Sequence, residues 1–208
     1  MTKVKICGIT NLEDALVSVE LGADALGFNF YEMSPRYITP QKASQIVKEL
    51  PDSTTKVGVF VNMKEARVDE FVGLLGLAAI QLHGDEDSDF VKELKRYTNA
   101  KVIKAFRVGR GFNPNEVVDF DVDAILLDAY SPNQYGGTGD SFDWHTAQEV
   151  KQFTKELYLA GGLAPENVSE AIKTVGPDFV DVASGVESEP GKKDPKKVAA
   201  FITNAKNA

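Results

Sequence analysis

The stretch KVKICGITNLEDALVSVELGADALGFNF, residues 3–30, holds an apolar run, a segment of helical periodicity and a second apolar run. The first run, Lys3–Ile9, meets a turn at Cys7-Gly8. Asn11 then supplies a side chain suited to cap a helix, whose apolar residues recur at helical spacing at Leu12, Ala15, Leu16 and Val19. The second run, Ala25–Phe30, resumes the strand pattern. The stretch therefore predicts a strand–helix–strand unit.

The same alternation continues through all 208 residues, and helical start signals such as Thr39-Pro40 and Asp194-Pro195 separate the apolar runs. The eight runs are Lys3–Ile9, Ala25–Phe30, Lys56–Val61, Ala79–Gly84, Lys101–Arg107, Ala124–Ala129, Glu156–Gly162 and Phe179–Val186. Strict alternation is typical of an α/β fold with a parallel sheet. Eight units of about 26 residues predict a single (β/α)8 TIM barrel domain over residues 1–208.

The fifth and seventh helical segments each have a proline near their expected start. Gly111-Phe112-Asn113-Pro114 leaves little room for the fifth helix, and Ala164-Pro165-Glu166-Asn167 is expected to begin the seventh.

An open doubly wound sheet is the alternative fold, but it usually carries a G-x-G-x-x-G turn after its first strand. Here Cys7-Gly8-Ile9-Thr10 follows instead, which favours the barrel.

Composition excludes several classes of partner. Charged residues make up 26% of the chain and the formal net charge is −8, without a cluster of Lys and Arg, so no nucleic acid is expected to bind. No apolar segment approaches the roughly 20 residues that span a bilayer, and the amino terminus lacks a secretory leader. A single unpaired cysteine suits a reducing compartment. We therefore expect a cytoplasmic protein that contacts no membrane.

Polar side chains stand where the predicted strands end, and in a barrel these ends converge on one rim that carries the catalytic loops. The candidates are Cys7 on the first strand, Asn29 on the second, Gln81 and His83 on the fourth, Asp128 on the sixth and Arg36 in the second loop. Two long connections, Tyr31–Thr39 and Tyr130–Asp143, are candidate lids.

Each candidate also has an ordinary structural interpretation. Cys7 cannot form an intramolecular disulfide, and a lone cysteine is often a small buried apolar residue. Asp128 could cap a helix, and Arg36 could be a solvated loop charge. His83 lacks a partner at metal-ligand spacing, so no metal and no cofactor are expected.

Glycine-rich turns follow the seventh and eighth strands, where barrels typically bind phosphate through backbone amides. They comprise Leu159-Ala160-Gly161-Gly162-Leu163 and Ala183-Ser184-Gly185-Val186-Glu187. We predict that these two turns bind a phosphate. The loop Gly136-Gly137-Thr138-Gly139 lacks the Lys-Ser/Thr of a nucleotide P-loop and is interpreted as a flap over the mouth.

Together these groups predict a small phosphorylated substrate. Arg36 could hold a carboxylate at the other end of that substrate, because a guanidinium matches a carboxylate in bidentate fashion. Cys7 and Asp128, on strands one and six, would then form an acid/base pair that moves protons without a metal or redox cofactor.

The motifs resemble those of the phosphoribosylanthranilate isomerase family, in order along almost the whole chain. The matching segments are Lys5-Ile6-Cys7-Gly8-Ile9-Thr10, Ser34-Pro35-Arg36-Tyr37-Ile38, Gln81-Leu82-His83-Gly84, Leu126-Leu127-Asp128, Gly136-Gly137-Thr138-Gly139, Phe142-Asp143-Trp144, the turn at 159–163 and residues 181–187. One departure is Asp140, where family members often have a basic or amide residue.

The resemblance implies an Amadori rearrangement of N-(5-phosphoribosyl)anthranilate in tryptophan biosynthesis. Carried onto this chain, Asp128 is the general acid that opens the ribose ring and Cys7 is the general base that removes the C2′ proton. Arg36 would hold the anthranilate carboxylate, and His83 and Gly137 would also contact the substrate. The residues that would receive the phosphate are Gly161, Gly162, Ser184 and Gly185. A monomer and a homodimer are both compatible with the sequence.

Four other functions are alternatives, three of them enzymatic and one not. A phosphosugar epimerase needs metal-ligand histidines, and an indole-glycerol-phosphate synthase needs catalytic lysines at strand ends. A Schiff-base aldolase could use Lys5 or Lys104 as nucleophile. A phosphosugar-binding module without catalysis is the non-enzymatic alternative.

Overall fold

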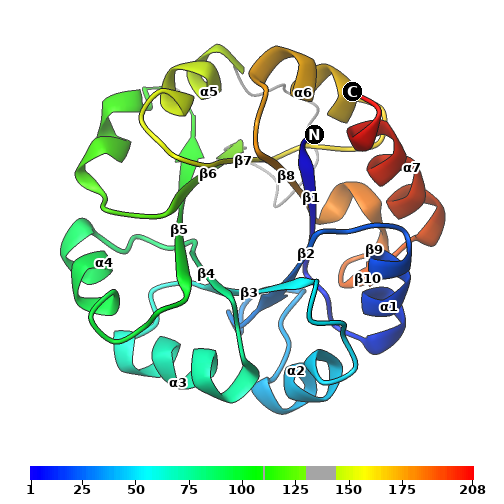
Figure 1. Ribbon diagram of the computed structural model, residues 1–208, viewed down its shortest axis with the longest axis horizontal. Coiled ribbons are helices and arrows are strands. Elements are labelled where there is room, and N and C mark those ends of the chain that lie inside the picture. Colours follow the sequence, from blue (N-terminus) through cyan, green and yellow to red (C-terminus); the bar gives the residue numbers. More distant parts are fainter. Residues whose placement is uncertain (110, 130–143) are drawn as a thin grey trace.

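Eight parallel strands pair in chain order, and β8 pairs with β1, so the sheet is a closed barrel (Figure 1). The computed structural model describes residues 1–109, 111–129 and 144–208. The strands are β1 (Lys3–Cys7), β2 (Ala25–Asn29), β3 (Thr55–Phe60), β4 (Ala79–Leu82), β5 (Lys101–Val108), β6 (Ala124–Ala129), β7 (Leu157–Ala160) and β8 (Phe179–Val182). This confirms the predicted single-domain (β/α)8 barrel.

Helices surround the barrel, one segment after each strand (Figure 1). They are α1 (Leu12–Glu20), α2 (Pro40–Val47), α3 (Glu65–Leu75), α4 (Ser88–Leu94), the 3₁₀ helix η1 (Pro114–Asp119), α5 (Trp144–Lys151), α6 (Val168–Val175) and α7 (Pro195–Lys206). The predicted caps are formed, since Asn11, Thr39 and Asp194 each accept a backbone N–H of the first turn. None of the described helices is long and apolar enough to cross a bilayer.

The structure corrects the ends of several predicted elements. The strands predicted as Lys3–Ile9, Ala79–Gly84, Glu156–Gly162 and Phe179–Val186 stop earlier, at Cys7, Leu82, Ala160 and Val182. The apolar residues beyond these points pack in turns and loops instead of continuing the ladder. The seventh helical segment also starts later, at Val168, because residues 165–167 form a turn.

The segment after β8 contains elements that the sequence did not predict. The short 3₁₀ helix η2 (Ser184–Val186) leads into an antiparallel hairpin of β9 (Glu187–Glu189) and β10 (Lys192–Lys193). This hairpin bonds back to α1, because the Asp14 carboxylate accepts the backbone N–H of Lys193 at 2.8 Å. The chain therefore folds over the outside of the β1 end before α7 begins.

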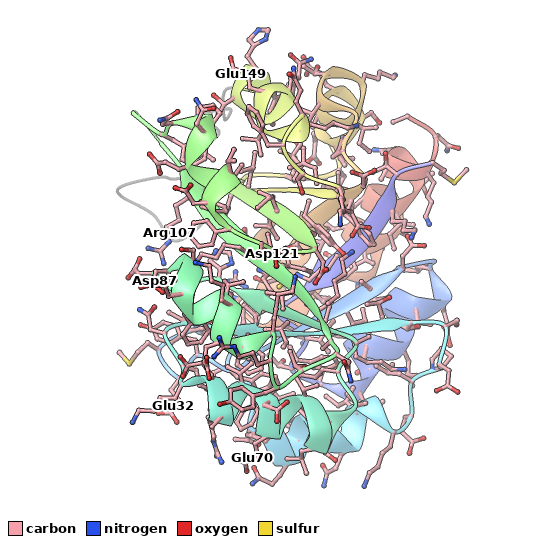
Figure 2. The ribbon with its side chains drawn as sticks, turned by 60° about the vertical axis from the view of Figure 1, so that its left-hand side comes forward. Glu32, Glu70, Asp87, Arg107, Asp121 and Glu149 are labelled. Carbon is pink, nitrogen blue, oxygen red and sulfur yellow. The ribbon has the colours of Figure 1, made fainter. Side chains whose placement is uncertain are left out.

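Alternate residues of each strand face opposite sides of the sheet. One buried cluster fills the barrel lumen: Ala25, Val57, Ala79, Ile103, Ala105, Ala124, Leu126, Tyr158, Ala160 and Phe179. The rings of Tyr158 and Phe179 stack there with centroids 4.2 Å apart. A larger cluster, which includes Leu26, Ile80 and Val180, lies between the barrel and the helices. Charged side chains such as Glu70, Asp121 and Glu149 point outward from this shell (Figure 2).

The outer core generates a stability prediction at α7. Phe201 is fully buried between this helix and the barrel, so Phe201→Ala leaves a cavity and is expected to lower the free energy of unfolding by about 3–5 kcal/mol. Chemical denaturation measures the change. Phe153 is 48% exposed, and Phe153→Ala is the matched control with an expected loss below about 1 kcal/mol. Equal losses in the two variants would contradict this description of the core.

Candidate active site

The carboxyl ends of the strands place a thiol and a carboxylate around one mouth. Cys7 is the last residue of β1, and Asp128 stands near the end of β6. Both have the strand parity of the lumen residues, since Lys5 and Leu126 precede them by two positions. The strands that carry them are separated by two others in the closed ring, β7 and β8. The predicted acid/base pair therefore faces one opening from different sides.

His83 joins Asp128 to the interior of the barrel. Its Nε2 lies 3.2 Å from Asp128 Oδ2, and its Nδ1 lies 2.8 Å from Gln81 Nε2. The Gln81 amide donates to Nδ1 in this arrangement, so Nε2 carries the ring proton and donates to the Asp128 carboxylate. His83 and Asp128 remain 23% and 32% exposed, so solvent and substrate reach both. Gln81 on β4, His83 directly after β4 and Asp128 on β6 thus form one hydrogen-bonded chain.

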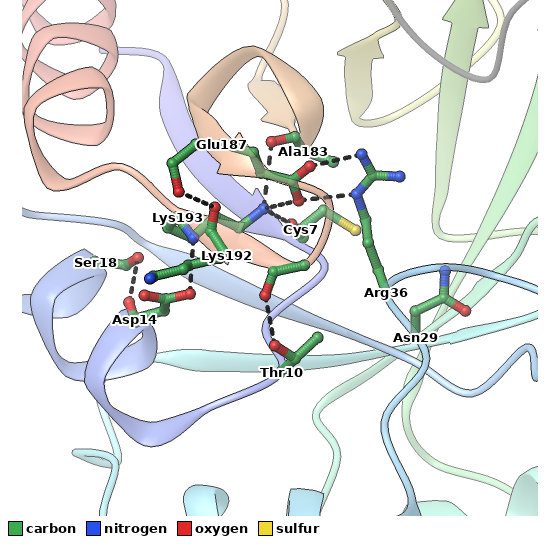
Figure 3. A network of polar contacts seen from close by, with 12 residues as sticks. Cys7, Thr10, Asp14, Ser18, Asn29, Arg36, Ala183, Glu187, Lys192 and Lys193 are labelled. Atoms are coloured by element: carbon green, nitrogen blue, oxygen red, sulfur yellow. Dashed lines mark hydrogen bonds and ion pairs between the residues drawn. The ribbon is translucent and has the colours of Figure 1, made fainter.

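Arg36 lies against the end of β1 and is held by a carboxylate of the β9–β10 hairpin (Figure 3). Its Nε and Nη2 donate to the two oxygens of Glu187 at 2.9 and 2.6 Å. Its aliphatic stem passes so close to Gly8 that a Cβ there would lie 2.6 Å from Arg36 Cδ. Arg36 is therefore a fixed group beside Cys7, not a solvated loop charge.

Lys193 completes this network, although no sequence pattern pointed to this residue. Its Nζ donates to Glu187 Oε1 at 2.9 Å, to the Cys7 carbonyl at 2.6 Å and to the Ala183 carbonyl at 3.3 Å (Figure 3). Burial acts to raise the pKa of Glu187, but Arg36 and Lys193 outweigh it and the net shift is downward. Glu187 stays ionised and ties β1, the second loop and the hairpin together.

The two glycine-rich turns lie side by side. Gly161 and Gly162 have φ of 83° and 67°, which turns the chain sharply after β7. Gly185, in η2, is so close to Leu163 that an added Cβ would overlap with the Leu163 carbonyl oxygen. The segment after β8 also begins a short extra helix, as in many barrels that bind phosphate at this place. The predicted residues Gly161, Gly162, Ser184 and Gly185 therefore form one rim segment.

Two predicted features lie outside the described residues. Gly137 and the rest of the loop Tyr130–Asp143 belong to the range 130–143, as does the departure at Asp140. The other long loop, Tyr31–Thr39, is described: Asn29 Nδ2 donates to Ser34 Oγ at 3.1 Å, and residues 29 and 37 form a bridge. Over the described parts of the chain, no group of His, Cys, Asp and Glu is arranged to hold a metal ion.

Lys5 and Lys104, the possible nucleophiles of an aldolase, are both buried and ion-paired. Lys104 has the parity of the outer core, and its Nζ bonds Glu86 Oε2 and the Gly84 carbonyl at 2.8 Å. Lys5 faces the lumen and pairs with Asp181 at 3.0 Å. A Schiff-base nucleophile must be a neutral amine in contact with the substrate. Neither lysine meets this requirement, so the structure does not favour the aldolase.

The closed barrel, with polar groups gathered at the carboxyl ends of its strands, defines the class of (β/α)8-barrel enzymes. Within this class, residues 4–204 match the family model described as N-(5'phosphoribosyl)anthranilate (PRA) isomerase, and the chain belongs to that family. It is 50% identical to the N-(5'-phosphoribosyl)anthranilate isomerase of Trichlorobacter lovleyi, with 100% of both chains covered. The enzyme of Geobacter sulfurreducens is 51% identical over 99% of each chain.

Solved structures agree with this assignment. The phosphoribosyl anthranilate isomerase of Thermotoga maritima superimposes with a TM-score of 0.92 at 44% identity, over 100% of both chains. A second structure, at a TM-score of 0.88 and 43% identity over 100% of both chains, holds the enzyme in complex with reduced 1-(o-carboxyphenylamino)-1-deoxyribulose 5-phosphate. The family that the motifs resembled is thus confirmed.

The contact between the glycine turns generates a second prediction. Gly185→Ala forces a Cβ against the Leu163 carbonyl, so the turns separate and the free energy of unfolding falls by about 1–3 kcal/mol. Gly73 lies in α3 with open space around it, and Gly73→Ala is expected to raise stability by about 0.5–1 kcal/mol. Thermal and chemical denaturation measure both. A neutral Gly185→Ala would show that the turns do not touch.

Proposed function

We propose that this chain converts N-(5-phosphoribosyl)anthranilate to 1-(2-carboxyphenylamino)-1-deoxyribulose 5-phosphate, a step of tryptophan biosynthesis. The observation that carries the proposal is the convergence of Cys7 and Asp128 on one mouth in a chain half identical, over its full length, to named isomerases. The loops that follow the strands form the catalytic face in this proposal. No metal or other cofactor takes part in the chemistry that we assign.

The two ends of the substrate are bound by groups on opposite sides of Cys7. Backbone amides at Gly161, Gly162, Ser184 and Gly185 receive the phosphate, supported by the contact between the two turns. Arg36 binds the anthranilate carboxylate. Glu187 occupies the Nε and Nη2 edge of the guanidinium. Among the described residues nothing bonds the edge formed by Nη1 and the second Nη2 hydrogen, so that edge can make a second bidentate contact.

Proton transfer then proceeds between two side chains and the sugar. Asp128 in its acid form donates a proton to the ribose ring oxygen, the C1′–O bond breaks, and an iminium cation forms between C1′ and the anthranilate nitrogen. The Cys7 thiolate takes the proton from C2′, and its electron pair neutralises the iminium to give an enolamine. Tautomerisation of the enolamine yields the ketone. The substrate forms no covalent bond to the enzyme.

His83 supports Asp128 in this scheme. Its Nε2 lies 3.2 Å from the carboxylate, close enough to donate a hydrogen bond that holds Asp128 in place. The sequence predicted that His83 contacts the substrate. The His83 side chain is 23% exposed, so the ring can also reach a bound substrate. We therefore propose that His83 positions Asp128 and also contacts the substrate.

The cellular location and the oligomeric state of the protein are also part of the proposal. The single thiol and the catalytic need for its reduced form support a cytoplasmic location. A solved structure 42% identical over 100% of both chains, with a TM-score of 0.89, is described as mutually generated monomers of the dimeric phosphoribosylantranilate isomerase from Thermotoga maritima. Of the two predicted states, this relative favours the homodimer.

The acid and the base are tested by removal. Cys7→Ala and Asp128→Asn should each lower kcat by about 10²–10⁴-fold with little change in KM, because proton transfer is lost while both ends of the substrate stay bound. The loss of anthranilate-type fluorescence on freshly made substrate measures the rate. Near-normal turnover by Asp128→Asn would rule out its role, since an amide has no carboxylic proton to donate.

The carboxylate anchor is tested at Arg36. Arg36→Met should raise KM by about 10–100-fold, since it removes charge-assisted hydrogen bonds to the substrate. Arg36→Lys should recover only part of the loss, because an ammonium cannot form the bidentate contact. Arg67 is 53% exposed on α3, where its guanidinium pairs with Glu70 of the same helix, and Arg67→Met serves as the matched control with unchanged KM. Equal effects of Arg36→Met and Arg67→Met would contradict the assignment.

A further inference from the structure

Lys5 is a charged side chain inside the barrel that the proposed mechanism does not use. It precedes Cys7 by two positions on β1, so both side chains face the lumen. Its exposed fraction is 0%, and its Nζ lies 3.0 Å from Asp181 Oδ2 on β8. A buried ammonium is costly unless it is paired, and such residues concentrate at functional sites.

The neighbouring strand shows that the ammonium and the thiol border the same space. Gly27 of β2 is the direct strand partner of Cys7. A Cβ built on Gly27 would lie 2.7 Å from Cys7 Sγ and 3.1 Å from Lys5 Nζ. Any larger residue would enter the space between these two atoms. Glycine at this position therefore lets the Lys5 ammonium and the Cys7 sulfur lie next to each other.

The hydrogen bonds of the pair leave the ammonium able to serve the sulfur. Lys5 Nζ has three N–H groups, and among the described residues its hydrogen bond to a carboxylate oxygen is the one to Asp181 Oδ2. The second oxygen of that carboxylate, Oδ1, is buried without a hydrogen-bond partner in the described parts of the chain. Asp181 thus holds Lys5 by one contact and does not enclose it.

We propose that Lys5 is a positioning residue whose buried ammonium stabilises the thiolate of Cys7, with Asp181 holding that ammonium in place. The inference rests on the proposed role of Cys7 as the base. In this role Lys5 assists proton abstraction by Cys7, whereas in the aldolase alternative Lys5 would itself be the nucleophile.

Several other charges surround Cys7 and set the background for this effect. They are Asp181 on β8, Arg36 after β2, Glu187 and Lys193 on the hairpin, and His83 and Asp128 across the mouth. Burial is the largest influence on the pKa of Cys7 and makes the net shift upward, and the charge of Lys5 is the strongest influence in the opposite direction. Lys193 also lowers the pKa of Cys7, whereas Asp181 raises it less than Lys5 lowers it.

The chain offers a direct measurement, because Cys7 is its single cysteine. Thiolate absorbance at 240 nm is titrated in the full-length protein, with Cys7→Ala subtracted to remove the tyrosine signal. Lys5→Met should raise the pKa of Cys7 by at least about one unit, which lowers the thiolate fraction at neutral pH about tenfold. The kcat at pH 7 should fall about tenfold and recover as pH rises through the new pKa, with KM unchanged.

Lys104→Met is the matched control. Lys104 is also buried and ion-paired, at 2.8 Å to Glu86, but it lies on the outer side of the sheet, so its loss should leave the Cys7 titration unchanged. If Lys5→Met does not fold, Lys5→Met/Asp181→Asn removes the pair without leaving a buried charge. This double variant should also raise the pKa of Cys7, by a smaller amount.

A folded Lys5→Met variant whose Cys7 titrates within about 0.3 units of the wild type would overturn the inference. So would a drop in kcat that is equal at every pH, because that would reflect altered structure without a change in thiolate fraction. The titration does not depend on turnover. Full activity of Cys7→Ala would therefore refute the proposed base while leaving the effect of Lys5 on the thiol measurable.

Discussion

Closure of the parallel sheet dictates where every side chain of the barrel can go. Because residues alternate between lumen and outer core, Lys5 and Cys7 both face inward, whereas Lys104 faces the helices. Buried side chains fill the lumen, with the stacked rings of Tyr158 and Phe179 near the amino-terminal ends of β7 and β8, and in barrels of this kind the site lies at the carboxyl ends of the strands. A polar group on an inward position near a strand end therefore becomes part of the site.

The local pattern predicted the barrel because each unit repeats the same two signals, an apolar run and a capped helix. Asn11, Thr39 and Asp194 act as caps as expected, since capping depends on residues close in sequence. The ends of the strands were less accurate. Apolar residues such as Ile9 continue beyond the ladder because they pack in turns, and hydrophobicity alone does not distinguish the two environments.

The candidate site was predictable where strand ends supply it and hidden where distant segments do. Cys7, His83 and Asp128 were selected from their positions after apolar runs. Lys193 was not selected, because its contact with the Cys7 carbonyl spans 186 residues. That contact also depends on the β9–β10 hairpin, which the pattern of apolar runs did not predict. Glu187 stood in a matched motif, but its bidentate hold on Arg36 follows only from the folded path of the chain.

The pairing of Lys5 with Asp181 joins residues 176 positions apart and so has a consequence for synthesis of the chain. During translation, Lys5 is among the first residues to leave the ribosome, and its carboxylate partner is made after most of the polypeptide exists. Until then the lysine stays hydrated, and β1 has no charge partner that would permit its burial. The barrel can close only when β8 pairs with β1, so the seam between its first and last strands cannot form until β8 has been synthesised.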